Sequence, residues 1–419
     1  MMLLSSIPRL VAVVLCAVRA TGCPFQLSHT LMPDDAVHAQ MRAEATHTQL
    51  SSALAEIQGS RRRLQTLDCF AESTYNTIVN EVSALGRAIT DLEAQSHFWG
   101  GIVRLVAHDF MDFNRNEAQQ FGSDGCIEWG LDTHTGLDDI WAEGTALFEL
   151  YESEYAGMGV SVADFWVIAG NAVIYETSSR TLSLPFRWGR LDAGSCEGSA
   201  ERLPGTSGCG EVERVFLTNM GLTWQDAVAL MGAHTLGRGL ESGHMGTWVD
   251  NVQRSTRFDN RYYDELISRD WEPRGNDDWT WDTPNERTLM LNTDMCLAYD
   301  VDEDQDCCAN RARGPVCQGL GNTVCPSAST VRPEAANAVT DFLGDGNALW
   351  FAAYATAWQA ATEKGAVELK DLDATCGGVD DPPNDPPSGG RPPGGGGPPG
   401  GGGPPGGGGG GRRGGGGRP

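Results

Sequence analysis

The stretch DAVALMGAHTLGR, residues 226–238, combines an apolar helical pattern with a single histidine. Thr223, shortly before it, is a good N-cap, and Asp226 takes the place of the acidic partner in a capping box. The pattern predicts a helix from Thr223 to Leu236. Small residues directly precede His234 on this helix, so a flat group could approach the imidazole ring closely.

A second histidine, His108, lies in the apolar stretch RLVAHDF, residues 104–110. Arg104 precedes it by one helical turn, so both side chains share one face of a helix. A lone histidine on an apolar helix is most often a packed core residue, and a solvated edge is another reading. Two such helices could instead hold haem between them, because haem iron accepts a neutral imidazole ligand.

Helical spacing dominates the chain between residues 68 and 378, with little of the strict alternation that strands need. We therefore predict a mainly α fold. The further expected helices are Phe70–Leu92, His97–Asn114, Gly136–Tyr155, Val162–Tyr175, Glu334–Leu343 and Ala348–Lys364.

The chain carries 56 acidic and 30 basic residues among 419, a formal net charge of −26. Such a charge disfavours nucleic acids and anionic membrane surfaces as partners. It would attract a cationic small molecule or a basic protein, although solubility alone also explains it.

The two ends of the chain differ from its middle. Residues 1–22 have the layout of a secretory signal peptide, with Arg9 before a short apolar run and small residues after it. We expect residues 23–67 to form a helical lead segment. Proline and glycine dominate residues 379–419, a composition typical of a disordered tail. These features predict a secreted protein without a membrane span, whose tail contacts the extracellular matrix or has no role.

Eleven of the 12 cysteines would remain after removal of the signal peptide. In an oxidising compartment most of them should form disulfides, and the odd count predicts one free or intermolecular thiol. Five cysteines lie between Cys296 and Cys325, which suggests a disulfide-linked surface loop. A zinc site is the alternative there, although neither a CxxC pair nor a nearby histidine supports it.

Motifs in order along residues 104–369 resemble the plant, fungal and bacterial haem peroxidase superfamily. RLVAHDF resembles its distal helix and DAVALMGAHTLGR its proximal helix. SVADFWVIAGNAV (161–173), LPFRWGRLDAG (184–194) and LWFAAYATAWQAATEKGAVEL (349–369) resemble other parts of the fold. SGHMGTW (242–248), FDNRYYDELI (258–267) and LMLNTDMCLAYD (289–300) resemble the proximal side of cytochrome c and ascorbate peroxidases. The resemblance implies a two-part helical fold over residues 68–378, with haem b between the distal and proximal helices.

On the proximal side, the resemblance implies that His234 is the iron ligand and that Thr235 borders the cofactor. Asp294 would accept the ring N–H of His234 and give the imidazole anionic character. Trp248 would pack against His234 and could relay electrons. Plain core packing of Trp248 is the alternative in a chain with 12 tryptophans.

On the distal side, His108 would move the proton of hydrogen peroxide and Arg104 would stabilise the charge that develops as the O–O bond breaks. Three positions depart from the family pattern. Ala107 replaces an aromatic residue, His134 stands where an asparagine orients the distal histidine, and Phe110 replaces a small residue. His134 could accept the same hydrogen bond, and the departures bear on the rate of peroxide activation more than on haem binding.

Cation sites of the family are partly kept. Asp109 and Asp124 resemble a distal calcium site, although Cys126 stands where a serine ligand is usual. Thr235 and Asp259 resemble a proximal site for calcium or potassium, which take hard oxygen ligands. Acidic residues on solvated loops are the alternative interpretation.

Positions at which relatives bind particular donors differ here. Glu241 replaces the arginine of ascorbate peroxidases, and Ala229 replaces the surface tryptophan of ligninolytic enzymes. The manganese-ligand positions hold His97, Gly101 and Leu240. A generic electron donor remains.

The motifs together predict a secreted haem peroxidase that takes part in the response to oxidative stress. It would reduce hydrogen peroxide to water with electrons from a small organic molecule or a protein. The rival hypothesis is a haem-binding extracellular matrix protein with weak or no turnover. Oxygen transfer through the space above Ala107 is a third hypothesis.

Overall fold

The computed structural model describes residues 49, 69–239, 246–275, 277–281, 288–301, 307–309, 323–344, 346–374 and 376. The signal peptide predicted at 1–22, the lead segment at 23–67 except Gln49, and the tail at 379–419 lie outside these residues. So do Leu240 and Glu241. What we predict of these parts stays a prediction.

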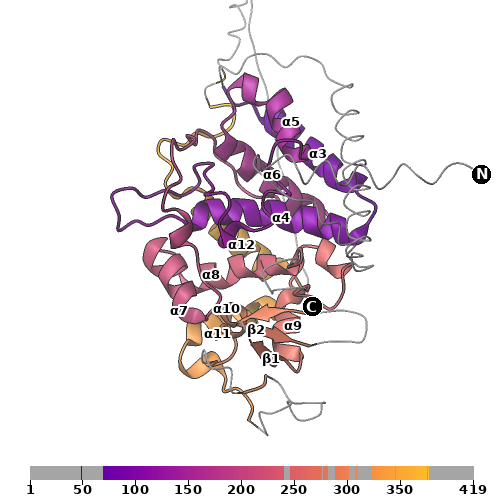
Figure 1. Ribbon diagram of the computed structural model, residues 1–419, viewed down its shortest axis with the longest axis vertical. Coiled ribbons are helices and arrows are strands. Elements are labelled where there is room, and N and C mark those ends of the chain that lie inside the picture. The colour runs from indigo at the N-terminus through magenta and orange to yellow at the C-terminus, as the bar shows by residue number, and fades with distance from the viewer. Residues whose placement is uncertain are drawn as a thin grey trace, which may run out of the picture. The chain divides into compact units, whose positions relative to one another are not determined.

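Four main helices form the N-terminal half of the described chain: α3 (Glu72–Ala88), α4 (Leu92–Met111), α5 (Ala146–Glu154) and α6 (Val162–Thr177). Two short 3-10 turns accompany them, η1 (Asp132–His134) and η2 (Ala156–Met158). α6 is almost wholly apolar and buried, so it forms the centre on which α3 and α4 pack (Figure 1).

The C-terminal half consists of short helices and one small sheet. Its elements are η3 (Ala200–Arg202), α7 (Cys209–Val212), the π-helix η4 (Glu213–Asn219), α8 (Trp224–Met231), η5 (Gly232–Thr235), η6 (Arg254–Thr256), α9 (Arg261–Ser268), β1 (Glu272–Gly275), β2 (Asp278–Thr280), β3 (Met290–Leu291), α10 (Asn292–Met295), η7 (Ala328–Thr330), α11 (Pro333–Leu343) and α12 (Ala348–Thr362). The sheet is antiparallel in the order β1-β2-β3, and Trp279 of β2 pairs with Pro273 and Met290.

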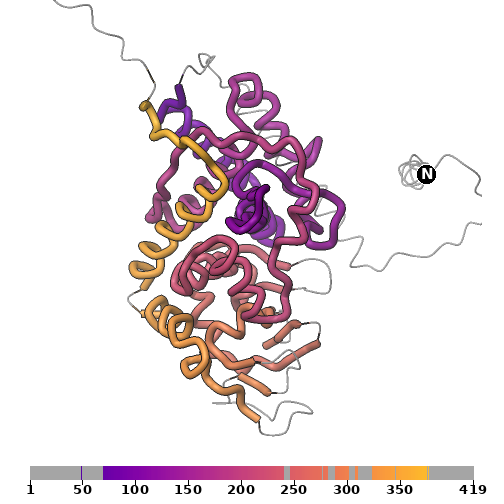
Figure 2. Tube along the Cα trace, turned by 90° about the vertical axis from the view of Figure 1, so that its left-hand side faces the viewer, coloured from indigo at the N-terminus to yellow at the C-terminus, as the bar shows by residue number. Residues whose placement is uncertain are grey.

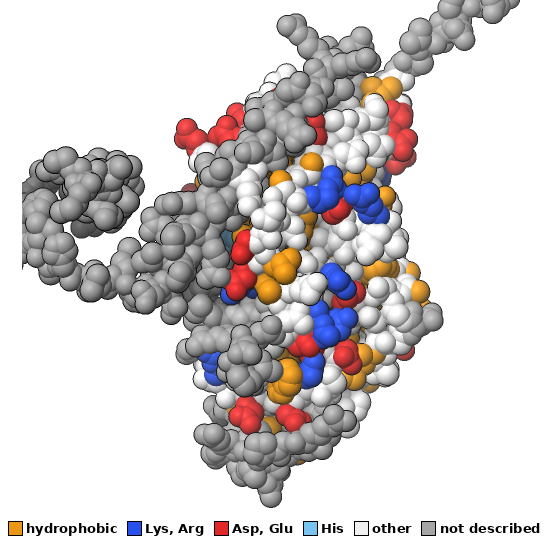
Figure 3. Space-filling model, turned by 90° about the vertical axis from the view of Figure 1, so that its right-hand side faces the viewer, with side chains coloured by type: hydrophobic (Ala, Val, Ile, Leu, Met, Phe, Trp, Pro, Cys, Tyr) orange, Lys and Arg blue, Asp and Glu red, His pale blue; other side chains and the backbone are white. Residues whose placement is uncertain are grey.

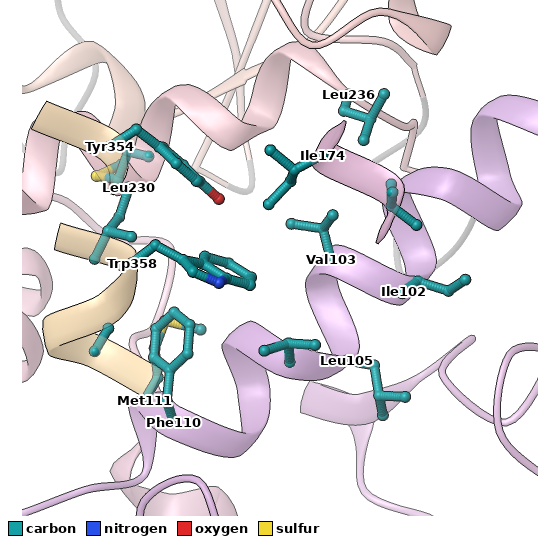
Figure 4. Packing of buried hydrophobic residues seen from close by; sticks show 14 of the residues in the cluster. Ile102, Val103, Leu105, Phe110, Met111, Ile174, Leu230, Leu236, Tyr354 and Trp358 are labelled. Atoms are coloured by element: carbon teal, nitrogen blue, oxygen red, sulfur yellow. The ribbon is translucent and has the colours of Figure 1, made fainter. Parts of the chain in front are cut away.

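The helix α12 links the two halves, as the tube in Figure 2 shows along one side of the molecule. The ring of Trp358 on α12 meets Phe110 of α4 edge to face at 5.7 Å, and its Nε1 donates to Asn171 Oδ1 of α6. Trp350, nearer the start of α12, donates to the carbonyl of Ala229 in α8. Figure 4 shows this apolar packing between α12 and α4, with Tyr354 beside Trp358. The N-terminal and C-terminal halves of the described chain therefore share one hydrophobic core.

The mainly helical fold is confirmed, and most expected helices lie within a few residues of their predicted bounds. The helix predicted over Gly136–Tyr155 is wrong in its first half, since α5 begins only at Ala146. Gly136 and Gly144 adopt positive φ angles of 80° and 90°, which a continuous helix does not allow. The helix predicted over Phe70–Leu92 is α3, which ends earlier, at Ala88, and the helix predicted over His97–Asn114 is α4, which begins earlier, at Leu92.

The described cysteines form disulfides, as predicted for most of the cysteines. Disulfides join Cys69 to Cys376, Cys126 to Cys196, Cys209 to Cys296 and Cys307 to Cys325. Cys308 is also disulfide-bonded. The zinc alternative is therefore wrong for Cys296, Cys307, Cys308 and Cys325, while Cys23 and Cys317 lie outside the described residues.

Acidic and basic side chains are interspersed on the face drawn in Figure 3. The net negative charge is thus not gathered into one patch there. Among the described residues, no helix combines the length and the apolar character that a bilayer crossing requires.

Candidate functional site

One face of α4 stays partly accessible, whereas the opposite face of the helix is buried in the core. Gly100, Gly101, Arg104, Ala107 and His108 are half-buried, and their spacing of three and four residues places them on one stripe. The neighbouring positions Ile102, Val103, Leu105, Val106 and Phe110 belong to the core. Gly237 and Ile140 cover the two glycines of this stripe, so a flat ligand could approach it beyond them, beside Ala107 and His108.

The start of α4 contacts the chain just beyond η5. A Cβ atom on Gly100 would lie 2.4 Å from the Cα of Gly237, so only glycine fits at this crossing. Ser96 Oγ lies 2.7 Å from Ser255 Oγ, and Arg238 forms an ion pair of 2.9 Å with Glu93. These contacts close one end of the space between α4 and the turn that carries His234.

On the proximal side, the buried carboxylate of Asp294 accepts four hydrogen bonds. His234 Nδ1 lies 2.8 Å from Oδ1, which also accepts from the hydroxyl of Tyr262 at 2.7 Å. Trp248 Nε1 donates to Oδ2 at 3.1 Å, and the backbone N–H of Leu291 donates to the same oxygen at 2.8 Å. The predicted trio of His234, Asp294 and Trp248 is therefore in contact.

The electrostatics of this cluster keep the carboxylate ionised. Burial pulls the pKa of Asp294 upward, but His234 and the hydrogen bonds outweigh it and hold the pKa below its usual value. Burial and then the nearby Asp294 raise the pKa of Tyr262 well above its usual range, so the phenol keeps its proton. The ring of Trp248 stacks on His234 with centroids 4.5 Å apart.

On the distal side, His108 Nδ1 lies 3.2 Å from Nδ1 of His134, which η1 carries in the loop after α4. His134 is 4% exposed. Arg104 donates to the backbone carbonyls of Thr133 and Thr135 at 2.9 and 2.8 Å. Arg104 and His108, the two predicted distal residues on α4, thus both bind the loop that carries His134, the third predicted distal residue.

Both distal imidazoles are neutral at pH 7. Burial, then the charges of Arg104, His134 and His234, lower the pKa of His108 well below its usual value. Burial and then Arg104 lower the pKa of His134 to about 4. A neutral imidazole is the form that accepts a proton, so His108 is ready to act as a base.

These residues fit haem. Each central histidine has its Nδ1 engaged, His234 with Asp294 and His108 with His134, which leaves each Nε2 for the space between the halves. A carboxylate behind a metal-binding imidazole fixes its tautomer and raises its basicity. Ala107 and Ala233 beside the two rings are only partly buried, so small methyl groups border that space.

The predicted distal cation site contains carboxylate oxygens without partners. Asp109 is fully buried and accepts from the N–H of Cys126, but its Oδ2 has no hydrogen-bond partner among the described residues. The same holds for Oδ1 of Asp124 and Oγ of Ser123. Burial, and secondarily the charge of Asp124, raises the pKa of Asp109 well above its usual value. Burial, and secondarily the charge of Asp192, raises the pKa of Asp124 to about 7.

The ligand set is nevertheless small. Cys126 is in a disulfide, which removes it as a ligand. Within the described residues, no group of three or more histidine, cysteine, aspartate or glutamate side chains is arranged to hold a metal ion. Of the proximal pair, Thr235 Oγ1 lies 3.4 Å from Asp259 Oδ1. Backbone and hydroxyl oxygens would have to complete either site, and calcium accepts both.

The sequence interpretation missed Tyr262. FDNRYYDELI holds two adjacent tyrosines, both buried, and only the fold shows which hydroxyl reaches Asp294 and which donates to the carbonyl of Val228. Two positions examined for manganese also have structural roles. His97 lies 3.5 Å from a carboxylate oxygen of Asp139, and Gly101 lies against the side chain of Ile140.

A sequence model of the family described as "Peroxidase" matches residues 92–311. That span begins with α4 and contains every predicted site residue.

Three similar proteins have curated names. A "Putative heme-binding peroxidase" of Cryptococcus neoformans is 36% identical over 173 residues, 37% of this chain and 48% of that protein. "L-ascorbate peroxidase 1, cytosolic" of Oryza sativa subsp. indica is 39% identical over 142 residues, 33% of this chain and 51% of the rice protein. "Cytochrome c peroxidase, mitochondrial" of Cryptococcus neoformans is 32% identical over 149 residues, 34% and 37% of the two chains. The matched regions span about half the length of the first two relatives and 37% of the third.

Proposed function

The chain belongs to the peroxidase family, and on that premise we propose that it is a haem peroxidase that reduces hydrogen peroxide to water. The observation that carries the proposal is the paired arrangement of imidazoles, one backed by a carboxylate and one by a neutral ring, across a stripe of small residues on α4. Bound haem would supply the iron that exchanges electrons with peroxide and with a donor.

The distal residues move the proton. His108 Nε2 would take the proton from the near oxygen of peroxide and deliver it to the far oxygen, which leaves as water. With His134 Nδ1 as the acceptor of the hydrogen bond between the two rings, the proton of His108 would stay on Nδ1 and its Nε2 would stay a base. Proton shuttling of this kind contributes roughly 100- to 10,000-fold to a rate.

Arg104 has a second role in this proposal besides its charge. Its two hydrogen bonds to Thr133 and Thr135 fix the backbone on both sides of His134. The guanidinium would therefore orient the distal pair while its positive charge favours the anionic oxygen that forms as peroxide breaks.

The proximal residues would hold haem iron through His234 Nε2. Asp294 fixes the ring from behind, and Trp248 stacks on it. Because Trp248 also donates to the Asp294 carboxylate, a positive charge on its indole would be favoured by a buried anion within hydrogen-bond distance. We propose Trp248 as the electron relay, to be tested by the loss of a radical signal in Trp248→Phe.

The peroxidase proposal is tested by mixing the haem-loaded full chain with hydrogen peroxide in a stopped-flow instrument. A rapid change of the Soret band, followed by return when a small organic donor is added, supports the peroxidase. A Soret band that peroxide leaves unchanged would favour the alternative, a haem-binding matrix protein with little turnover.

We also propose export and a distal calcium ion. Four disulfides among the described residues support an oxidising compartment. The unpartnered oxygens of Asp109 and Asp124 support calcium, which should raise the melting temperature by preferential binding to the folded chain. In Asp109→Asn that rise should disappear. We further propose that the electron donor is a small organic molecule or a protein. Contact of the tail with the extracellular matrix is also part of the proposal.

A further inference from the structure

A cavity lies behind the distal histidine pair. It has a volume of about 570 Å³, and its walls include Trp129, His134, Asp138, Asp139, Trp141 and Phe148. A cavity of this size accommodates a small organic molecule. His134 is common to this cavity and to the distal pair, whereas His108 and Arg104 are not among the lining residues.

The loop that carries His134 separates the cavity from the peroxide side. From the α4 side, Arg104 holds the carbonyls of Thr133 and Thr135, and His108 holds one edge of the His134 ring. The opposite edge of that ring bears Nε2. The loop is therefore a wall with α4 on one side and the cavity on the other.

The Nε2 atom of His134 is buried and has no hydrogen-bond partner in the part of the chain that the structure describes. In the proposed function His108 donates from Nδ1 so that its Nε2 can act as a base, and the neutral ring of His134 then accepts at Nδ1 and carries its proton on Nε2. An N–H group buried without an acceptor is costly, and native proteins rarely leave one so. A ligand that places an oxygen there would satisfy it.

The other walls set the chemistry of such a ligand. Trp141 is buried and meets Phe148 edge to face at 5.3 Å, whereas Trp129 is 43% exposed. Asp138 and Asp139 are both exposed at the cavity. Aromatic faces and carboxylates together attract an organic cation, and the net charge of −26 favours its approach.

We propose that this cavity binds a small aromatic amine that carries a hydroxyl or carbonyl oxygen. The ring packs against Trp129 and Trp141, the ammonium group faces Asp138 and Asp139, and the oxygen accepts from His134 Nε2. Two hydrogen bonds, one on each nitrogen of His134, thereby connect the occupant to the distal base His108. The site is separate from the face of α4 on which haem would lie.

The test is a binding measurement on the haem-loaded full chain without peroxide, by calorimetry. Tyramine has all three features, phenethylamine lacks the oxygen, and 4-hydroxyphenylacetate reverses the charge. We expect tyramine to bind tightest. Phenethylamine should bind about 2- to 12-fold more weakly, the worth of one hydrogen bond. The anion should bind at least about tenfold more weakly.

Variants locate the binding. Asp138→Asn with Asp139→Asn should weaken tyramine by about fivefold or more. The matched control is Asp132→Asn with Glu143→Gln, which removes the same charge from exposed residues nearby that do not line the cavity and should leave affinity unchanged. In His134→Leu, tyramine and phenethylamine should bind alike.

Three results would overturn the proposal. They are equal affinity for the three compounds, an equal loss of tyramine affinity in the two double variants, and the absence of saturable binding up to about 10 mM. Binding weaker than that limit is nonspecific. Trp129→Ala, at an exposed position, gives a further check and should weaken all amines. The binding measurement contains no peroxide, so it is independent of the stopped-flow test of the proposed function. If tyramine binds but peroxide leaves the Soret band unchanged in that other test, only the peroxidase function is refuted. Peroxide turnover without tyramine binding would refute only this site.

Discussion

The two histidines at the centre of the molecule are held by different kinds of acceptor. Behind His234 stands a buried carboxylate that accepts four hydrogen bonds, so no oxygen of Asp294 is left without a donor. Behind His108 stands a second imidazole, neutral, with its far nitrogen unsatisfied within the described residues. The proximal network is complete and the distal one is open.

That difference matches the role that each side would have in the proposed peroxidase. A full negative charge behind His234 pushes electron density toward the ring, which suits a permanent metal ligand. A neutral acceptor behind His108 orients the ring without making it strongly basic, so it can take a proton and give it back. The asymmetry therefore predicts that changes on the distal side alter rate, while changes on the proximal side alter binding and potential.

The largest effect should follow removal of the distal base. In His108→Leu the rate constant for the reaction with peroxide should fall by roughly 100- to 10,000-fold, since proton transfer loses its carrier. Stopped-flow absorbance measures it, and an unchanged resting Soret band shows that haem is still bound. A loss below tenfold would contradict the role of His108.

On the proximal side, Asp294→Asn should lower haem affinity or activity by about 10- to 100-fold, the usual cost of losing a partner behind a metal ligand. The amide cannot carry the charge that His234 faces, and its nitrogen opposes two of the four donors, because each carboxylate oxygen accepts two hydrogen bonds. Haem transfer to a competing apoprotein measures affinity. If only the peroxide rate changed, the assignment of functions to the two sides would be wrong.

The two sides should also differ in their response to pH. The pKa of His108 lies well below 6.5, so the peroxide rate should stay constant as pH falls to 6.5 and decline, tenfold per unit, only below that lowered pKa. The unfolded chain takes up protons at about pH 6.5 while the buried distal histidines do not, so stability also falls below that pH.

Asp294 changes stability in the same direction but in a lower pH window, because its folded-state pKa is also lowered. Its folded pKa is below 3.8, so its stabilising contribution is complete above that value and is lost only as pH drops through the lowered pKa. The rate measured from pH 4 to 8 checks the distal statement, and the melting temperature followed from pH 8 to about pH 2 checks both. A rate that declines already above pH 6.5 would contradict the distal assignment.

A smaller effect should follow loss of the neutral acceptor. His134→Leu should slow the peroxide reaction by about 2- to 12-fold, the worth of one hydrogen bond. His134→Asn should restore much of the rate, because an amide oxygen also accepts from His108 Nδ1. Equal rates in the two variants would show that the hydrogen bond has no part in catalysis.

The smallest effect should come from Tyr262→Phe. This change removes one donor from Asp294 Oδ1, so the carboxylate pulls harder on His234 and favours the oxidised iron. We expect the midpoint potential to fall by roughly 20–60 mV if the iron feels one hydrogen bond of 0.5–1.5 kcal/mol. Spectroelectrochemistry measures it, with Tyr263→Phe as the control, since that hydroxyl donates to Val228 instead.

Much of this arrangement is predictable from the sequence because it is local. The capping box of Thr223 and Asp226 is present as expected, and the spacing of Arg104 and His108 sets their shared face. His134 was predictable from its place in a recognisable loop. The helix start at Ala146 was not, because the apolar pattern of Gly136–Tyr155 continues through two glycines whose positive φ angles depend on how the loop packs.

Long-range partners were the least predictable. The hydroxyl of Tyr262 meets a carboxylate 32 positions away, and nothing in the YY pair indicates which ring turns inward to it. The cavity behind His134 likewise draws on side chains between Trp129 and Phe148 whose common orientation depends on the turn that Arg104 holds.

The sequence separation of the two pairs has a consequence for biosynthesis. His108 and His134 are 26 positions apart, whereas His234 must wait for Asp294, 60 positions further along. A chain that grows from its N-terminus at about 5–20 residues per second can complete the first pair several seconds before the second begins to form. Prosthetic-group capture should therefore be among the last events of maturation, after the ribosome has added nearly all of the described helices.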